Sequence, residues 1–351
     1  MSYQRKHNTG YILRICGIAA LGGILFGYDT AVISGAIEAL KTYFNLSPAE
    51  TGWAVSNVVI GCVVGAFAAG PLAARWGRKK ALMLAALLFT VSAVGAALAP
   101  TFTWFVIYRI IGGLAVGIAA TVSPMYMSEV SPKDMRGRAL SMQQFAIVFG
   151  QIVIFYVNFK IASLASEAWL VEMGWRWMFA SGVIPCILFC ILVFVIPESP
   201  RWNVMMGRDD QALAMLTKVS NAAHAQNLLK EIKDSLQQDQ QQRHRKLNYG
   251  DVRVRFILFV GCMIAMLQQV TGVNVMMYYA PVVLKTVTEN AQEALFQTIW
   301  IGVLQLVGSV IGAMLMDRMG RIPLMRYGTL GAIAGLLLTS YALYTQDRKS
   351  V

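Results

Sequence analysis

The sequence predicts an all-α membrane protein that crosses the bilayer nine times. Of its 351 residues, 57% are hydrophobic and only 14% are charged, against about 25% charged in an ordinary soluble domain. This much apolar sequence exceeds what one water-exposed globule buries, so lipid is the expected solvent. The net charge of +12 lies in short basic clusters between apolar stretches. That arrangement is typical of membrane loops and argues against a nucleic-acid partner.

Nine stretches are long and apolar enough to cross a bilayer, which takes about 20 residues. They are residues 12–39, 51–73, 81–99, 103–129, 139–162, 176–196, 254–284, 294–316 and 324–345. The first stretch is too long for a signal peptide and contains Asp29, so we expect it to be retained. Within the polar stretch 203–251, residues 209–241 are rich in Ala, Leu, Lys and Gln and are expected to form amphipathic surface helices.

The basic residues assign a direction to these spans. Of the 30 Lys and Arg residues, 23 fall in one alternate set of segments and Arg109 lies inside a span. The opposite set holds only Lys41, Lys160, Arg176, Lys285, Arg348 and Lys349. Because Lys and Arg concentrate on the cytoplasmic side, the N-terminus and the 203–251 linker are expected in the cytoplasm. With nine spans, the C-terminus is then expected outside.

An internal repeat divides the chain. The segment 74–80 (ARWGRKK) is matched by 317–323 (DRMGRIP) at an offset of 243 residues, and Gly27-Tyr28-Asp29 by Gly272-Val273-Asn274 at an offset of 245. Parallel repeats of this kind build many transporters. We therefore expect a six-helix N-terminal bundle (1–202), a cytoplasmic linker with amphipathic helices (203–251) and a partial C-terminal bundle of helices seven to nine (252–351).

Two ionisable residues lie inside spans, where charge is costly and therefore usually functional. Asp29 is ~26 Å along the first span and Arg109 is ~9 Å from the opposite end of the fourth. In a core ~30 Å thick these depths are similar, so the two side chains are within reach of each other. A purely structural ion pair is one interpretation. The other is a proton site in which Asp29 binds the proton and Arg109 tunes its affinity.

Amide side chains supply a second candidate site. Gln144, Gln151 and Asn158 recur every seven residues, which places them on one face of the fifth span. Gln268, Gln269 and Asn274 surround Gly272 in the seventh span, where Gly and the later Pro281 allow the helix to break. Amides with flat side chains such as Phe26, Tyr278 and Tyr279 suit a polyhydroxylated ligand. The alternative is that the amides only join helices.

The sequence contains no motif of an enzyme or of a cofactor site. It has no H-E-x-x-H, nucleophile elbow or P-loop, so we expect no enzyme activity and no cofactor. The five cysteines lie in apolar stretches without metal-ligand spacing, and no metal site is expected. Glycines at 61, 65 and 70 in the second span and at 112, 113 and 117 in the fourth are expected to allow close helix packing.

Four further motifs resemble those of the sugar porter family of the major facilitator superfamily. They are Gly70-x4-Arg75-x-Gly77-Arg78-Lys79, Pro124-x-Tyr126-x-x-Glu129-x-x-Pro132-x3-Arg136-Gly137, Pro197-Glu-Ser-Pro-Arg201-Trp202 and Gln268-Gln269-x4-Asn274-x3-Tyr278-Tyr279. Residues 25–35 and 144–151 look most like the bacterial xylose–proton symporters of that family. The resemblance implies a major facilitator fold, residence in a bacterial inner (plasma) membrane, and a monosaccharide and a proton as partners.

The resemblance also implies roles for individual residues. It places monosaccharide contacts at Gln151, Gln268, Gln269, Asn274 and Tyr278, beside the Phe26 suggested above, and proton coupling at Asp29 and Arg109. It implies a cytoplasmic charge network of Arg78, Glu129, Arg136, Glu198 and Arg201 that latches the outward-open state. Alternating access of two rocking halves would then carry a pentose or hexose with the proton.

Several departures from the family pattern open other interpretations. Ala74 stands where Asp is frequent, and Gly182 stands where the xylose–proton symporters carry Glu. Helices ten to twelve have no counterpart in the 351 residues, so we expect the chain as given to be truncated and unable to accumulate sugar. The alternative functions are a non-transporting remnant and a membrane sensor that binds sugar without moving it.

Overall fold

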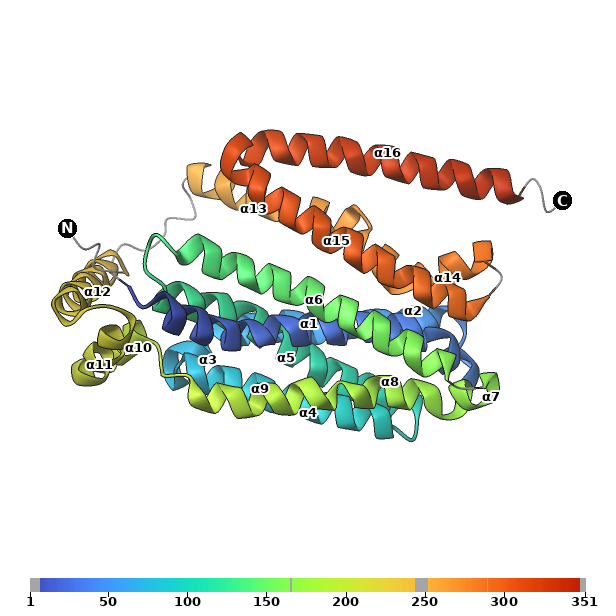
Figure 1. The fold of residues 1–351 in the computed structure, drawn as a ribbon, viewed down its shortest axis with the longest axis horizontal. Helices are drawn as coiled ribbons and strands as arrows, with labels where there is room; N and C mark the ends of the chain where they lie inside the picture. Colours follow the sequence, from blue (N-terminus) through green and yellow to red (C-terminus); the bar gives the residue numbers. More distant parts are fainter. Residues whose placement is uncertain (1–6, 165, 244–251, 289, 348–351) are drawn as a thin grey trace. The chain divides into compact units, whose positions relative to one another are not determined.

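The computed structural model describes residues 7–164, 166–243, 252–288 and 290–347. Apart from one isolated bridge between His7 and Ser220, the regular structure in these ranges is helical (Figure 1). Nine of the described helical segments are long and apolar enough to span a membrane, which agrees with the nine expected spans.

The first six spans contain helices α1 to α9 and one π-helical segment. Their bounds are α1 Thr9–Tyr43, α2 Pro48–Ser56, α3 Val58–Trp76, α4 Arg78–Leu98, α5 Phe102–Val130, α6 Arg136–Ser163, α7 Glu167–Trp169, η1 Leu170–Gly174, α8 Trp175–Ser181 and α9 Val183–Val195. The second span is interrupted at Asn57, and the sixth contains the π-helical turn η1. The Asn57 interruption lies inside the stretch 51–73 that the sequence predicts as one span, whereas η1 precedes the predicted sixth span 176–196.

In the described part of the remaining chain there are seven further helices. They are α10 Pro200–Met205, α11 Asp209–Val219, α12 Ala222–Arg243, α13 Val252–Val270, α14 Val273–Thr288, α15 Ala291–Met319 and α16 Arg321–Asp347. The surface helices expected in the linker are present as α11 and α12. The break expected in the seventh span is also present, because Gly272 has a positive φ of 77° between α13 and α14. Glycine adopts this conformation without a Cβ clash.

In the N-terminal bundle, α1 packs against α5 and α6, α3 packs against α5, and α4 packs against α5, α8 and α9 (Figure 1). Glycines bring α3 and α5 together. A Cβ on Gly65 would overlap the backbone of Leu114, and a Cβ on Gly113 would overlap the backbone of α3 at Val58. Close packing through small residues is therefore confirmed at this interface. The expectation is wrong for Gly70, which faces open space.

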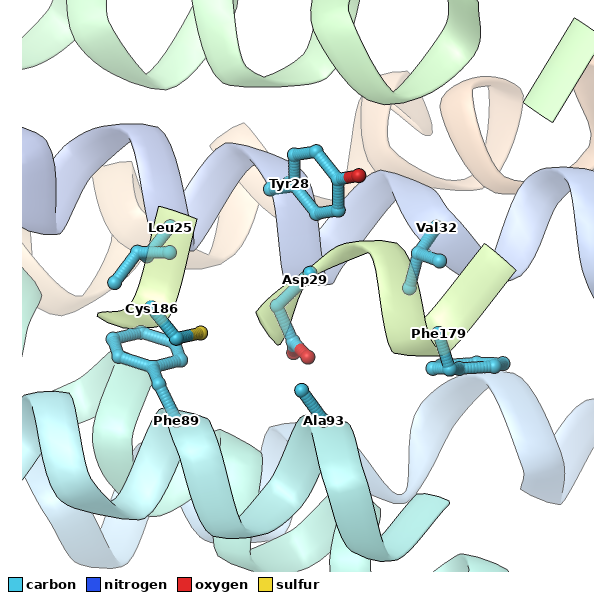
Figure 2. A pocket seen from close by; sticks show the side chains of 9 residues that line it. Leu25, Tyr28, Asp29, Val32, Phe89, Ala93, Phe179 and Cys186 are labelled. Atoms are coloured by element: carbon cyan, nitrogen blue, oxygen red, sulfur yellow. The ribbon is translucent and has the colours of Figure 1, made fainter. Parts of the chain in front are cut away.

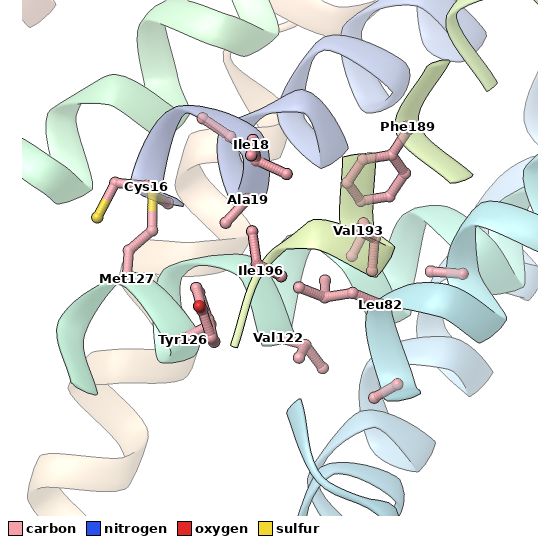
Figure 3. Close-up of a cluster of buried hydrophobic side chains, with 14 of the residues drawn as sticks. Cys16, Ile18, Ala19, Leu82, Val122, Tyr126, Met127, Phe189, Val193 and Ile196 are labelled. Carbon is pink, nitrogen blue, oxygen red and sulfur yellow. The ribbon is translucent and has the colours of Figure 1, made fainter. Parts of the chain in front are cut away.

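Two clusters of buried apolar side chains fill the bundle. The first joins α1, α4, α5 and α9, and Figure 3 shows Leu82, Val122, Tyr126, Phe189 and Val193 from it. The second lies nearer the C-terminal end of α1 and includes Phe105, Trp175, Phe179 and Met277. Large apolar side chains on the outside of the bundle, such as Phe67 and Ile184, are exposed. In a membrane protein such side chains face lipid.

The chain forms two compact units, Met1–Gly302 and Val303–Val351. The first unit contains the six-span bundle, the described linker helices, α13, α14 and the beginning of α15. This division does not test the domain boundaries at 202 and 251 that the repeat predicts. Those boundaries stay a prediction. All the sites described below lie in the first unit.

Candidate functional site

A buried ion pair joins α1 to α5. Nη1 of Arg109 is 2.9 Å from Oδ1 of Asp29 and also donates to the backbone carbonyl of Asp29 at 3.1 Å. The Arg109 side chain is 1% exposed and the Asp29 side chain 14%. The pair anticipated from matching depths in the membrane is therefore present. Removing two charges from water is costly, so an ion pair this deeply buried needs compensating contacts.

Neighbouring elements partly supply those contacts. The Arg109 guanidinium lies 5.6 Å from the ring centroid of Phe179, a cation–π contact that no pattern in the sequence predicts. A Cβ at Gly112, one turn beyond Arg109, would lie 2.5 Å from Ser92 Oγ and 3.5 Å from Asp29 Oδ1. Glycine at this position therefore leaves the room that the Ser92 hydroxyl occupies next to the Asp29 carboxylate.

The Asp29 carboxylate borders a small cavity between α1, α4, α8 and α9 (Figure 2). In Figure 2 the carboxylate projects from α1 toward Ala93 on α4, among the labelled side chains of Phe89, Phe179 and Cys186. The centre of a water molecule has about 20 Å³ available there, which is enough for about one water. Oδ2 of Asp29 is buried without a hydrogen-bond partner among the described residues. Of the two carboxylate oxygens, Oδ1 is therefore held by Arg109, and Oδ2 has an unused acceptor position.

The fold separates this ion pair from the amide site by placing them on opposite faces of α1. Gly27 and Asp29 are two residues apart, about 200° around the helix. Asp29 faces α5, whereas a Cβ on Gly27 would overlap the carbonyl of Ile147 on α6. The same close approach puts the backbone nitrogen of Gln151 next to α1. Glycine at position 27 therefore fixes how near α6 and Gln151 come to α1.

The amides of α6 divide into three environments. Gln151 is 7% exposed and its Oε1 is buried without a partner among the described residues. Asn158 is fully buried and donates to the carbonyl of Val32 on α1, so it joins two helices. Gln144 is exposed. The adjacent Gln143, which sequence reasoning missed, is 6% exposed, and both of its amide atoms are buried without a partner.

The other expected ligand-binding residues have different surroundings. Phe26 is half-buried against the first apolar cluster, and Tyr278 is half-buried against the second. Gln268, Gln269 and Asn274 are exposed near the α13–α14 break, where Nδ2 of Asn274 donates to Oε1 of Gln269 at 2.8 Å. The break thus brings two of the three amides together. No described contact joins either of them to Gln151.

Charged residues cluster at the end of the bundle that contains the α3–α4 turn. Arg78 makes a bidentate ion pair with Glu129, with Nε and Nη2 at 2.8 and 2.7 Å from the two carboxylate oxygens. Glu198 accepts hydrogen bonds from the backbone N–H groups of Arg78 and Lys79, the first two residues of α4. A carboxylate at a helix N-terminus is electrostatically favourable. Gly77, with φ of 94°, makes the turn that exposes these N–H groups.

The two remaining members of the expected charge network lie outside this cluster. Arg201 pairs with Asp239 on α12 at 2.7 Å, and Arg136 is exposed without an ion pair among the described residues. Ser199, which sequence reasoning did not include, donates its hydroxyl to Glu129. The Ser199 hydroxyl also caps α10 by accepting from the Trp202 N–H. No group of three or more His, Cys, Asp or Glu side chains in the described ranges is arranged to hold a metal ion.

Comparison with known proteins agrees with this architecture. The model of the family described as "Sugar (and other) transporter" matches residues 15–351. The chain is 41% identical to the D-xylose–proton symporter of Escherichia coli strain K12, over 97% of this chain and 74% of that protein. It is 36% identical to the arabinose–proton symporter of Bacillus subtilis strain 168, over 97% of this chain and 73% of that protein.

Among solved structures, the chain is likewise similar to sugar transporters. A partially occluded, inward-open structure of the xylose transporter from E. coli superposes with a TM-score of 0.86 at 40% identity, over 96% of this chain and 80% of that one. The proton–xylose symporter bound to 6-bromo-6-deoxy-D-glucose superposes with a TM-score of 0.81 at 42% identity, over 90% of this chain and 71% of that one.

The nine spans, the broken seventh helix and the charged pair buried in the bundle are features of an α-helical membrane transporter with the major facilitator fold. Within that class, the chain belongs to the sugar transporter family. Its relatives are transporters and not enzymes, in agreement with the expectation from the sequence.

Proposed function

We propose that this protein carries a monosaccharide, a pentose or hexose, across a membrane together with a proton by alternating access. The single observation that carries the proposal is the buried Asp29–Arg109 ion pair beside a water-sized cavity. Support also comes from two relatives at 41% and 36% identity that are sugar–proton symporters. The partners of the protein are then the monosaccharide, the proton and the surrounding lipid bilayer.

Asp29 is the proposed proton acceptor. Its Oδ2 is free to take up a proton while Oδ1 remains bound to Arg109. Protonation would leave the Arg109 charge uncompensated, so proton binding changes the energy of the α1–α5 contact. A transporter couples its two substrates when binding of one alters the conformational balance that the other needs. Arg109 therefore tunes the proton affinity of Asp29 and transmits its protonation to the helix contact.

The sugar site is proposed at Gln151 on α6, Phe26 on α1, and Gln268, Gln269, Asn274 and Tyr278 on α13 and α14. Gln151 supplies a buried acceptor without a partner among the described residues, which a sugar hydroxyl can satisfy. The α13–α14 break turns Gln269 and Asn274 toward each other, as a site built on irregular backbone requires. Phe26 and Tyr278 provide flat apolar faces.

The charge cluster is proposed as a latch on the cytoplasmic side. Arg78, Glu129 and Glu198 hold the N-terminus of α4 to the ends of α5 and the α9–α10 connection. Arg201 ties α10 to α12, and Arg136 at the start of α6 is free of ion pairs within the described ranges. The Arg201–Asp239 pair is substantially exposed and contributes little to stability, so it is easily exchanged, whereas the Arg78–Glu129 pair is buried. These residues therefore stabilise the outward-open state when the two halves approach on this side.

The positive-inside bias supports a cytoplasmic N-terminus and linker, in a bacterial inner membrane. The test of function is transport by the purified 351-residue chain in liposomes with an imposed proton gradient. Concentrative uptake of xylose, arabinose, galactose or glucose supports symport and contradicts the sequence-based expectation that this chain is inactive. Sugar binding without uptake supports the remnant or sensor alternative. Absence of both binding and uptake contradicts the proposed function of the chain.

A further inference from the structure

A second hollow lies away from both proposed sites, at the end of α1 that contains Ser34 to Thr42. It has a volume of about 480 Å³ and is bounded by α1, α6, α7, η1, α8, α14 and the start of α15, all within the unit Met1–Gly302. We call it the α1–α14 hollow. Its volume is in the ~300–1,000 Å³ range of small-molecule sites. Under the proposed topology it opens to the outside.

The lining of the α1–α14 hollow combines both kinds of surface that a sugar needs. Its polar side chains include Glu38, Thr42, Glu167, Lys285, Asn290 and Gln292. Apolar surface is supplied by Leu170, Met178, Pro281 and Leu295. Two carboxylates and one ammonium give no strong preference for an ion of either sign. Carboxylates and amides instead accept from and donate to hydroxyl groups, while the apolar side chains contact the C–H face of a sugar ring.

The polar groups facing the hollow are weakly engaged. Nζ of Lys285 is 3.9 Å from Oε2 of Glu38, and these side chains are 47% and 52% exposed. Exposed pairs at this separation contribute little to stability, so a ligand displaces them at small cost. Among the described residues, the Gln292 side chain makes one long hydrogen bond, of 3.3 Å from Nε2 to the carbonyl of Ala162. A hydroxylated ligand therefore meets side chains whose existing contacts are easily exchanged.

An apolar layer separates the hollow from the amide site. Met277 and Ala280 on α14 are buried, and Met277 belongs with Ile154, Phe155 and Met178 to the second apolar cluster. Met178 lines the hollow, whereas Gln151 precedes Ile154 by about one turn on α6. A sugar in the hollow is thus one apolar layer away from the proposed central site.

We propose that the α1–α14 hollow is a second monosaccharide site, in which sugar binds outside the apolar layer before α14 moves away from α1. This inference rests on the proposed function, because it takes the same ligand class. It differs in location, since none of the residues proposed for the central site lines the hollow. Glu38, Lys285 and Gln292 make the polar contacts, and the Glu38–Lys285 pair opens when sugar enters.

The test measures sugar occupancy at the hollow itself. The native cysteines that are exposed or half-buried, Cys62, Cys190 and Cys262, are replaced by Ser, and Thr42→Cys places a reactive thiol in the lining. Alkylation of this thiol by a fluorescent maleimide is timed on the purified 351-residue chain in detergent, with rising D-xylose or D-glucose. Glycine betaine at equal osmolarity is the control, and Ala39→Cys is a second reporter. Equilibrium dialysis with radiolabelled sugar measures total binding in parallel.

We expect sugar to slow alkylation several-fold, and Gln151→Ala to leave this protection unchanged while reducing total binding. Gln292→Ala should remove the protection, whereas Gln297→Ala, on the same helix outside the lining, should not. Protection that disappears with Gln151→Ala overturns the inference, because the thiol then only reports the central site. Binding in dialysis without protection also overturns it, and the proposed function stands. If sugar neither protects the thiol nor binds in dialysis, the second site and the proposed function are both overturned.

Discussion

Arg109 on α5 holds the Asp29 carboxylate of α1 at 2.9 Å through one nitrogen, while its other two guanidinium nitrogens are buried without partners among the described residues. The contact therefore satisfies only part of the hydrogen-bonding capacity of the guanidinium and of the carboxylate. A half-satisfied buried pair is costly to keep and sensitive to any change in charge. That sensitivity is what a proton-coupled conformational change requires.

The first prediction concerns the Asp29 proton. Asp29→Asn keeps the size of the side chain and its hydrogen bond to Arg109 but removes the group that takes up a proton. In a form of the protein that transports sugar, concentrative uptake driven by a proton gradient should be lost. Exchange of labelled for unlabelled sugar should survive, because it needs no net proton movement. Wild-type accumulation by the variant would show that the coupling proton binds elsewhere.

The second prediction concerns the energy of the pair. Arg109→Gln leaves the Asp29 carboxylate buried without a counter-charge and should lower the free energy of unfolding by about 3–5 kcal/mol. Adding Asp29→Asn should restore part of that loss, because the uncompensated charge is removed. Thermal unfolding in detergent measures both. Arg201→Gln is the matched control: its partner Asp239 is 54% exposed, so it should cost about 0–1 kcal/mol. Equal losses for Arg109 and Arg201 would contradict the interpretation.

The third prediction separates sugar recognition from helix packing on α6. Gln151→Ala removes a buried amide whose oxygen has no partner within the described chain, and should weaken sugar binding by about 1–3 kcal/mol. Gln144→Ala, two turns earlier on the same helix but exposed, should leave the affinity unchanged. Equilibrium dialysis with labelled xylose and glucose compares the two variants. Unchanged affinity of Gln151→Ala for both sugars would assign the amide to packing.

The fourth prediction uses two glycines of one helix. Gly65→Val places a branched side chain where even a Cβ overlaps the backbone of Leu114. It should separate α3 from α5 and lower the yield of folded protein and its unfolding temperature. Gly70→Val, on the same helix, faces open space and should be tolerated. Size-exclusion profiles and thermal unfolding in detergent compare them, and equal stability would show that α3 and α5 do not pack as described.

The fifth prediction concerns topology. A reporter enzyme that is active only in the cytoplasm should work when fused after Gln240 and fail when fused after Val351. The reason is that 23 of the 30 Lys and Arg residues lie in the segments placed inside. A reporter active only outside the cytoplasm should give the opposite result. Activity of the first reporter at both positions would contradict the nine-span topology.

Much of the fold follows from local properties of the sequence. Apolar length alone located nine spans, because each must cover the hydrocarbon core. Gly272 marked the break in the seventh span, since a residue without a Cβ adopts a positive φ. Depth in the membrane brought Asp29 and Arg109 to one level, and the structure pairs them. Each of these properties depends on residue type or on the number of residues along one helix, and both can be read from the sequence.

The partners of individual side chains were decided by the tertiary structure alone. Phe179 lies over Arg109, Asp239 pairs with Arg201, and the buried amide near the start of α6 is Gln143 instead of Gln144. The hollow lined by Glu38 and Lys285 had no signal in the sequence. Contacts of this kind depend on the rotation and crossing of helices far apart in the chain. Periodicity fixes which residues share a face of one helix, but not which face of another helix they meet.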